Sequence, residues 1–422
     1  MKEVDLLIVG GGCAGMAGAL GAYEKGIRNI LLLERNPRLG GILNQCIHNG
    51  FGLGEFKEEL TGPEFAARFE KEVEKRGIPY LCDTYVTEIT KEKVVRYSNK
   101  EGFFEVKAKA ILFAAGCLER SAGSIALPGE RPSGIMTAGL AQLLLNQYGY
   151  LPGNRIFILG SGDIGLIMAR RLTLEGAKVL GVAELCPWSN GLNRNIVQCL
   201  EDFDIPLYLS TTVTKAIGKS RLEAIELSSV DTQRKPIPGT ERRIECDTLI
   251  LSVGLLPNTH LLKNAGVRLG ASKGAAVDES YETSVPGLFS AGNVLHVHDL
   301  ADNVVSEARK AGEEAALYIL GQSKEKERTV VVKAGRNVGY VVPSFLSFPA
   351  NQGKISFKFR VSRPLKANSI VVKQGEEVCK TLFNPFLIPS EMKIIDIDAS
   401  LFDPSKGDIE ISVMEKEAPY AR

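Results

Sequence analysis

The sequence has 8 cysteines but no two of them in a C-x-x-C arrangement. Such pairs build most zinc knuckles, iron–sulfur ligand sets and thioredoxin-type dithiols, so the pattern indicates none of these sites. Isolated cysteines in a reducing compartment are mostly small core residues. We therefore expect free thiols and no metal site.

Neither an excess of one charge nor a long hydrophobic run is present. Lys and Arg number 51 against 50 Asp and Glu, and this balance argues against a nucleic-acid partner. No run approaches the 18 or so apolar residues of a transmembrane segment, and the N-terminus lacks a signal-peptide layout. We expect a soluble, cytoplasmic protein.

What is present is an ordinary globular composition at a length of 422 residues, with 44% hydrophobic and 24% charged residues. A chain of this length accommodates about three domains.

Two segments share one pattern, an apolar strand, a glycine turn, a helix and a second strand that ends in an acid. The first runs from Asp5 through Gly10-Gly-Gly-Cys-Ala-Gly15 to Glu34. The second runs from Arg155 through Gly160-Ser-Gly-Asp-Ile-Gly165 to Glu184. Two such β-α-β units predict two dinucleotide-binding domains.

The glycines and the acid have separate roles in this pattern. The first glycine permits the tight turn, the second lets the backbone approach a pyrophosphate, and the third lets helix and strand pack closely. The acid accepts hydrogen bonds from ribose hydroxyls. Glu184 would repel a 2′-phosphate and no Arg follows it directly, which favours NAD(H) over NADP(H).

The rest of the chain predicts an amphipathic helix over 61–76 and strands over 77–118. Strands also fill 206–253, with a polar interruption, and 322–328 is a charged linker. Short alternating runs over 330–422 predict a small all-β sandwich.

Three further motifs carry a resemblance to a known family. They are Ile111-Leu-Phe-Ala-Ala-Gly116, Asp247-Thr-Leu-Ile-Leu-Ser-Val-Gly-Leu-Leu-Pro-Asn-Thr259 and Thr283-Ser-Val-Pro-Gly-Leu-Phe-Ser-Ala-Gly-Asn293. In this order around two glycine motifs, they resemble the pyridine nucleotide-disulfide oxidoreductase superfamily, that is, glutathione-reductase-type flavoproteins. The resemblance covers residues 1–325. It implies FAD in the first fold, NAD in the second and hydride transfer from nicotinamide to flavin N5.

The expected fold class is α/β, with two Rossmann-like dinucleotide-binding domains and a small C-terminal all-β sandwich. The FAD domain is expected over 1–118 and 247–325, the NAD domain over 119–246, and the β-rich domain over 326–422.

Two departures from the family pattern matter for function. Asn293 replaces the family's Asp, and its amide can still hydrogen-bond the ribityl hydroxyls. The segment Gly40-Gly-Ile-Leu-Asn-Gln-Cys-Ile-His48 keeps only the second motif cysteine, Cys46. The dithiol mechanism of the disulfide reductases is therefore disfavoured.

The segment Leu39–Leu53 resembles a narrower group, the FAD/NAD oxidoreductases that accompany anaerobic glycerol-3-phosphate dehydrogenases. Cys117-Leu-Glu-Arg120 and Leu127–Met136 resemble the same group. This group is related to subunits of opine, proline and cyanide-forming dehydrogenase complexes. Several relatives end in a cysteine-rich cluster domain, which the cysteine-poor segment 330–422 does not match.

The resemblance places Cys46 and His48 opposite the isoalloxazine, as catalytic candidates. Cys46 could act there as a thiolate, or be a buried thiol with His48 hydrogen-bonded locally. His296, His298 and Asp299 could line the flavin edge. A metal site is not expected because H-x-H places no third ligand.

A helix beginning near Asn303 is expected to direct its N-terminus at the flavin N1/C2 region. The residues expected to bind the two cofactors are Gly10, Gly12, Gly15, Glu34, Arg35, Gly41, Val86, Ala115, Gly116, Gly292, Asn293, Asn303, Val304, Gly160, Gly162, Asp163, Ile164, Gly165, Glu184 and Gly254.

Three functions stay open at this point. The first is an electron-transfer subunit, part of an oligomer with a glycerol-3-phosphate-oxidising dehydrogenase and a small iron–sulfur protein. The second is a stand-alone single-cysteine flavoenzyme, such as an NADH oxidase, a peroxidase or a coenzyme A-disulfide reductase-like protein. The third is a scaffold subunit whose nucleotide folds are structural.

Overall fold

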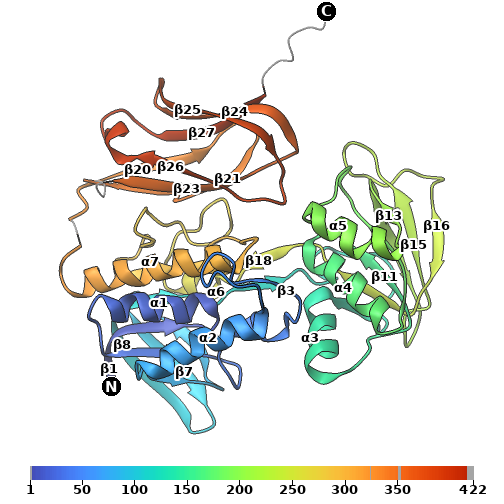
Figure 1. Cartoon of the computed structure of the whole chain (residues 1–422), viewed down its shortest axis with the longest axis horizontal. Coiled ribbons are helices and arrows are strands. Elements are labelled where there is room, and N and C mark those ends of the chain that lie inside the picture. The colour runs from blue at the N-terminus through green and yellow to red at the C-terminus, as the bar shows by residue number, and fades with distance from the viewer. Residues whose placement is uncertain (1, 324, 350–352, 416–422) are drawn as a thin grey trace, which may run out of the picture. The chain divides into compact units, whose positions relative to one another are not determined.

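The computed structural model describes residues 2–323, 325–349 and 353–415. The chain divides into two compact units (Figure 1). Unit 1 comprises Met1–Cys117 and Pro257–Arg422, and unit 2 comprises Leu118–Leu256.

Unit 1 contains a seven-stranded sheet with the order β5-β2-β1-β8-β7-β6, and β19 also pairs with β8. The strands β5, β2, β1, β8 and β19 are parallel, while β6, β7 and β8 form antiparallel pairs. The middle of β1 is buried on both faces, as expected for a parallel sheet covered by helices or loops. The strands are β1 (Lys2–Val9), β2 (Ile30–Leu33), β5 (Tyr80–Leu81), β6 (Tyr85–Ile89), β7 (Val94–Asn99), β8 (Gly102–Phe113) and β19 (Leu288–Ser290).

The helices α1 and α7 of unit 1 pack against each other at very short range. A Cβ at Gly312 of α7 would lie 2.0 Å from the carbonyl oxygen of Gly18 in α1. A Cβ at Gly21 would lie 2.3 Å from the Arg309 carbonyl oxygen. The other short elements of this part are β3 (Asn49–Phe51) and β4 (Leu60–Thr61). The helices are α1 (Cys13–Glu24), η1 (Gly41–Gln45), α2 (Gly62–Lys75), α6 (His260–Asn264), η3 (Gly292–Val294) and α7 (Ala301–Ile319).

The helix predicted over 61–76 is confirmed as α2. Thr61 and Glu64 form a capping box at its N-terminus, and Phe65, Phe69 and Val73 form its buried face.

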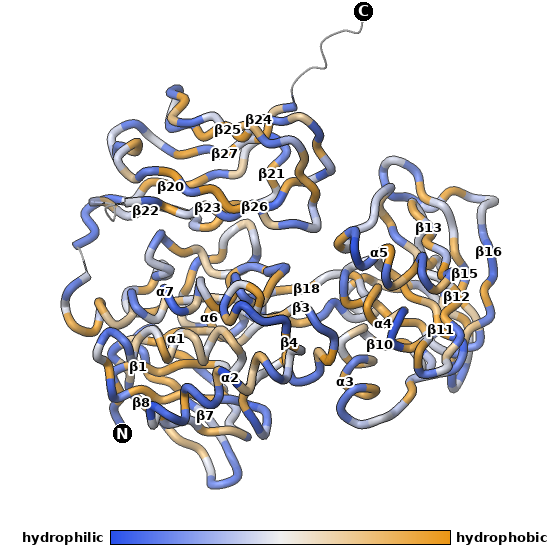
Figure 2. Tube along the Cα trace, viewed as in Figure 1, coloured by the Kyte–Doolittle hydropathy of each residue, from blue (hydrophilic) through white to orange (hydrophobic). Residues whose placement is uncertain are grey.

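Unit 2 is built on the second glycine motif, around a five-stranded sheet with the order β10-β17-β11-β12-β13. A three-stranded antiparallel sheet, β14-β15-β16, and a two-stranded pair, β9-β18, complete its strands. Figure 2 shows hydrophobic residues along β11 and hydrophilic ones on the outer strand β16. The helices are α3 (Ala138–Tyr148), α4 (Asp163–Leu174), α5 (Asn193–Cys199) and η2 (Glu201–Phe203). The strands are β9 (Cys117–Glu119), β10 (Ile135–Thr137), β11 (Arg155–Leu159), β12 (Lys178–Ala183), β13 (Leu207–Tyr208), β14 (Thr211–Ile217), β15 (Ala224–Ser229), β16 (Arg242–Glu245), β17 (Thr248–Leu251) and β18 (Leu255–Pro257).

One expected boundary needs correction. The family pattern predicts that the chain returns to the FAD domain at residue 247, but β17 lies between β10 and β11 in the sheet of unit 2. The apolar strand must stay there to complete that sheet, so the unit ends at Leu256.

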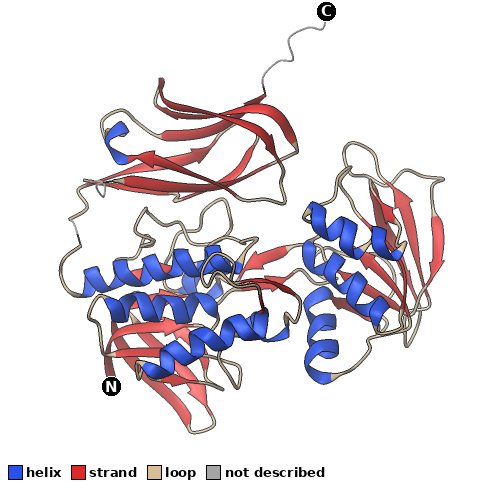
Figure 3. Cartoon of the chain, in the orientation of Figure 1, coloured by secondary structure: helices blue, strands red, loops and turns tan. Residues whose placement is uncertain are grey.

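The C-terminal part of unit 1, called the β domain below (residues 328–415), has two layers of strands. One sheet has the order β22-β20-β27-β24-β25 and the other β21-β23-β26, and Figure 3 shows one short helix beside them. The expected all-β sandwich is confirmed. The predicted linker 322–328 includes residue 324, which lies outside the described residues. The elements are β20 (Arg328–Ala334), β21 (Val338–Val342), β22 (Phe345–Phe348), β23 (Lys354–Val361), β24 (Leu365–Gln374), β25 (Glu377–Leu387), β26 (Lys393–Asp398), η4 (Ala399–Leu401) and β27 (Ile409–Glu415).

Across the described ranges, none of the helices combines the length and apolar character needed to cross a membrane.

Candidate functional site

The first glycine motif closes a tight turn on one side and leaves the backbone open on the other. Gly10 has a φ of +105°, and a Cβ there would lie 2.5 Å from the Ala114 carbonyl oxygen. A Cβ at Gly15 would lie 1.8 Å from the Gly10 carbonyl oxygen. A Cβ at Gly12 would meet no atom within 4 Å, and Gly12 caps α1 without any side-chain hydrogen bond. The open backbone and the positive helix end fit a pyrophosphate group.

Glu34 lies buried at the end of β2, with its carboxylate held by two backbone groups. The Gly11 N–H donates to Oε2 at 2.6 Å and the Asn36 N–H donates to Oε1 at 2.8 Å. Each carboxylate oxygen can accept more than one hydrogen bond. The acid is therefore fixed beside the glycine turn and keeps the capacity to accept from ribose hydroxyls.

The second motif repeats this arrangement in unit 2. Gly160 has a φ of +96°, and a Cβ at Gly165 would lie 2.6 Å from the Ser252 Cβ. Gly162 caps α4 without a side-chain hydrogen bond. Glu184 accepts from the Ser161 N–H at 3.0 Å and from the Ser161 hydroxyl at 2.6 Å. This geometry fits a second dinucleotide.

Other predicted contacts of unit 2 lie around this turn. Asp163 Oδ1 accepts from the Leu192 N–H at 2.8 Å and from Asn195 Nδ2 at 2.6 Å, so this side chain holds the segment that follows β12. Ile164 is half-buried in α4, and Gly254 is exposed beyond β17.

The remaining predicted contacts of unit 1 lie at strand ends and in one neighbouring turn. Arg35 follows β2 and is exposed, Val86 is buried in β6, and Ala115 and Gly116 follow β8. A Cβ at Gly41 would lie 3.1 Å from the Cα of Gly12, so the structure brings η1 against the first glycine turn.

The segment Gly292–Asn293 lies between α1 and α7. A Cβ at Gly292 would lie 2.8 Å from the Cβ of Ala14, near the N-terminus of α1. The amide oxygen of Asn293 accepts from the His298 N–H at 3.0 Å. The amide NH2 group is then the donor with which Asn293 can bind a ribityl hydroxyl.

The helix expected near Asn303 begins at Ala301, and its N-cap, Leu300, makes no side-chain hydrogen bond. Asp302 accepts from the backbone N–H groups of Gly52 and Glu55, at 3.2 and 2.8 Å. Asn303 is half-buried and Val304 is buried. The first turn of α7 is thus fixed to the loop that follows β3.

Cys46 follows η1 and is buried. Its thiol donates to the Ile42 carbonyl oxygen at 3.3 Å. Burial, and to a lesser degree the nearby Cys13, raises the pKa of Cys46 to about 12, so the thiol is protonated at neutral pH. His48 is half-buried, and its ring centroid lies 5.2 Å from that of Phe51.

His296, His298 and Asp299 take other positions than the flavin-edge hypothesis places them in. Both imidazoles are buried against Glu307, and Asp299 pairs with Arg360 of the β domain. Sequence reasoning missed Glu307 and its partner Lys358. The available signal was a charged residue on the apolar face of a helix, with Val304, Ala308 and Ala311 on the same face.

Comparisons with known proteins agree with this geometry. The family model described as "Pyridine nucleotide-disulphide oxidoreductase" matches residues 4–315. One subunit of alkyl hydroperoxide reductase, in Staphylococcus aureus (strain MRSA252), is 26% identical over 324 residues, 75% of this chain and 58% of that protein. Hydrogen cyanide synthase subunit HcnB of Pseudomonas aeruginosa is 26% identical over 344 residues, 75% of this chain and 70% of that protein.

Among solved structures, thioredoxin reductase of T. acidophilum is similar with a TM-score of 0.61 and 24% identity, covering 76% of this chain and 99% of that one. This likeness shows the shared two-domain nucleotide-binding fold. The chain spans little more than half the length of the alkyl hydroperoxide reductase relatives that it matches. The two glycine turns, their acids and the family match over residues 4–315 establish that the chain belongs to the pyridine nucleotide-disulphide oxidoreductases, enzymes that use FAD and a pyridine nucleotide.

Proposed function

We propose that this enzyme is an electron-transfer subunit. It moves reducing equivalents between NAD(H) and FAD and exchanges them with a partner dehydrogenase that oxidises glycerol 3-phosphate. The observation that carries the proposal is a pair of complete nucleotide folds in a chain whose flavin-motif cysteine, Cys46, is a buried thiol without the second cysteine of that motif. Without the motif dithiol, the electrons need another acceptor or donor.

The residues divide the binding work between the two units. In unit 1, Gly12 and the N-terminus of α1 would bind the FAD pyrophosphate, Glu34 the adenosine ribose and Asn293 the ribityl chain. In unit 2, Gly162 and Glu184 would bind NAD(H) in the same way. The bound FAD supplies an isoalloxazine that exchanges hydride with the nicotinamide.

A partner is supported by the names of the relatives, since both are designated subunits. The resemblance of Leu39–Leu53 to the group that accompanies anaerobic glycerol-3-phosphate dehydrogenases supports the identity of this partner. We place the complex in the cytoplasm as an oligomer that includes a small iron–sulfur protein. The 8 free cysteines fit a reducing compartment.

The test is affinity purification of the tagged chain from its native host after mild cross-linking. We expect a dehydrogenase to co-purify and glycerol 3-phosphate to reduce the flavin only in the complex. NADH should reduce the flavin of the isolated chain as well. Full turnover of the isolated chain with its own acceptor would contradict the proposal.

The lone Cys46 favours one second candidate, a stand-alone single-cysteine flavoenzyme. It requires rapid NADH consumption by the pure chain with oxygen, peroxide or a disulfide, and loss of that activity in Cys46→Ser. Cys379→Ser, in β25 of the β domain, is the matched control. We expect both variants to consume NADH as slowly as the wild type, because the buried Cys46 is protonated.

A further inference from the structure

The carboxylate of Glu307, on α7, is fully buried and has four polar partners. Oε1 accepts from the Gly292 N–H at 2.8 Å and contacts His298 Nε2 at 3.1 Å. Oε2 contacts His296 Nε2 at 2.9 Å and forms an ion pair with Lys358 Nζ. The four partners come from the second FAD motif, the residues that follow it and the β domain.

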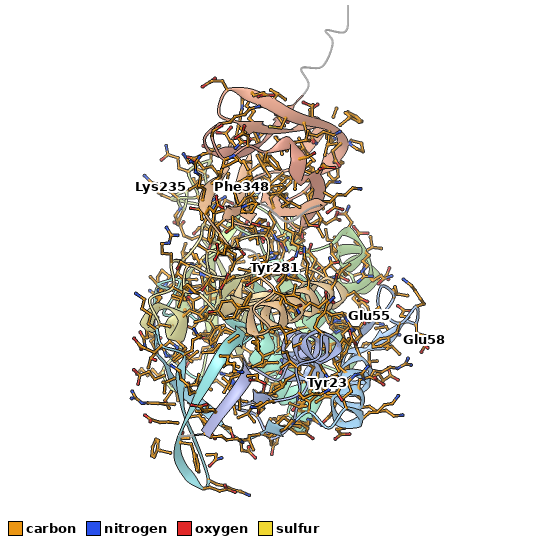
Figure 4. The ribbon with its side chains drawn as sticks, turned by 90° about the vertical axis from the view of Figure 1, so that its left-hand side faces the viewer. Tyr23, Glu55, Glu58, Lys235, Tyr281 and Phe348 are labelled. Atoms are coloured by element: carbon orange, nitrogen blue, oxygen red, sulfur yellow. The ribbon has the colours of Figure 1, made fainter. Side chains whose placement is uncertain are left out.

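Lys358 supplies the positive charge of this cluster. Burial lowers the pKa of His296 to about 4 and so keeps its imidazole neutral. Although burial opposes it, the neighbouring Glu307 holds the pKa of Lys358 above its usual value. The Lys358 ammonium also contacts the Tyr281 hydroxyl at 3.0 Å. Figure 4 labels Tyr281 below Phe348 of the β domain.

A metal ion is the alternative occupant of this cluster. Ligand atoms of His296, His298 and Glu307 lie within 4.8 Å of one another, and two histidines with a carboxylate are a common ligand set. A divalent ion there would add two charges beside a buried ammonium that already neutralises the carboxylate, an arrangement that low-dielectric surroundings penalise. The geometry therefore favours Lys358 as the built-in cation.

The cluster is joined to the second FAD motif at two points. Glu307 fixes the Gly292 N–H, and the His298 N–H fixes the amide oxygen of Asn293. Lys358 and Arg360 lie on one face of β23, because alternate residues of a strand share a face. Arg360 contacts the Val297 carbonyl oxygen at 3.1 Å and pairs with Asp299. A single strand thus holds the segment 296–299 on both sides of His298.

We propose that Lys358 is a positioning residue for FAD, through which the β domain completes the flavin site of unit 1. Its ammonium neutralises Glu307, and the neutralised carboxylate holds the Gly292–Asn293 turn in the conformation that binds the ribityl and pyrophosphate groups. The inference depends on FAD binding and is independent of any partner dehydrogenase.

The test compares Lys358→Met, Glu307→Gln and the double variant, each as full-length apoprotein titrated with FAD. Removing one member of a buried ion pair leaves an uncompensated charge, whereas removing both does not. We expect each single variant that folds to bind FAD about tenfold or more weakly than the wild type. The charge-balanced double variant should bind more tightly than either single one. Lys333→Met, an exposed lysine of β20 paired with Asp408, is the matched control and should bind FAD as the wild type does.

Two further readouts separate positioning from simple destabilisation. Flavin that remains bound to Lys358→Met should have a lower reduction potential, because the negative charge of Glu307 is no longer balanced, and the double variant should restore the wild-type potential. Equal FAD affinity and potential in wild type and single variants would overturn the proposal, as would a double variant no better than the single ones. Stoichiometric zinc or iron in the purified wild type, with loss of FAD on chelation, would overturn it in favour of a metal site.

Discussion

At the scale of single residues, two glutamates at the ends of homologous strands have different cofactors. NADPH would place a phosphate near Glu184, and like charges a few ångströms apart cost on the order of 1–4 kcal/mol. This predicts a roughly tenfold to thousandfold preference for NADH. Glu184→Gln keeps an oxygen for the Ser161 N–H and removes the charge, so it should narrow the preference and raise the Michaelis constant for NADH.

Glu34→Gln is the matched control for this experiment. It should weaken FAD retention and leave the nucleotide preference unchanged. The measurement is anaerobic bleaching of the flavin band at about 450 nm with each nucleotide. Equal reduction rates of the wild type with NADH and NADPH would contradict the NAD assignment, and exchanged phenotypes would contradict the assignment of the two folds.

At the scale of elements, the contact between α1 and α7 depends on glycine. Alanine at position 312 would favour the helix by about 1 kcal/mol, but its Cβ would lie 2.0 Å from a backbone oxygen of α1. Backbone cannot move aside as a flexible side chain can, so the steric effect dominates. We expect Gly312→Ala to destabilise the protein by about 1–3 kcal/mol in chemical denaturation.

Gly339→Ala is the control, because its Cβ would meet its nearest atom, the Arg360 carbonyl oxygen, only at 3.6 Å. It should change the free energy of unfolding much less. A Gly312→Ala variant as stable as the wild type would show that α1 and α7 can separate without loss.

The elements also show what sequence can predict here. The glycine turns, the helix α2 and the sandwich strands follow from local patterns, because turn chemistry and hydrophobic periodicity act over a few residues. The alternation Lys354-Ile-Ser-Phe-Lys-Phe-Arg-Val361 correctly separates the two faces of β23. It does not reveal that the polar face is covered, so the ion pair of Lys358 with Glu307, which lies far away in sequence, could not be anticipated. Such contacts depend on how one domain packs on another.

At the scale of the whole molecule, the packing of the β domain makes the stability of unit 1 depend on pH. Glu279 is buried and accepts from the Ser347 N–H of β22 at 3.0 Å. Burial, with Asp278 nearby, raises the pKa of Glu279 to about 7, although Ser347 and Lys326 oppose this. An acid whose folded-state pKa exceeds its unfolded value of about 4.3 stabilises the fold fully below the lower value. That contribution is lost as pH rises through about 7.

Glu279→Gln removes this dependence and keeps an oxygen for the Ser347 N–H. At pH 8 we expect the variant to be more stable than the wild type by about 1–3 kcal/mol, because the wild type must ionise a buried carboxyl there. Near pH 5 the wild-type carboxyl is mostly protonated in the folded state, so the two proteins should unfold at similar temperatures. The measurement is thermal unfolding of both proteins from pH 5 to 8 at constant ionic strength. A difference in Tm that stays constant over this range would show that Glu279 does not titrate there and that its environment holds it in one protonation state.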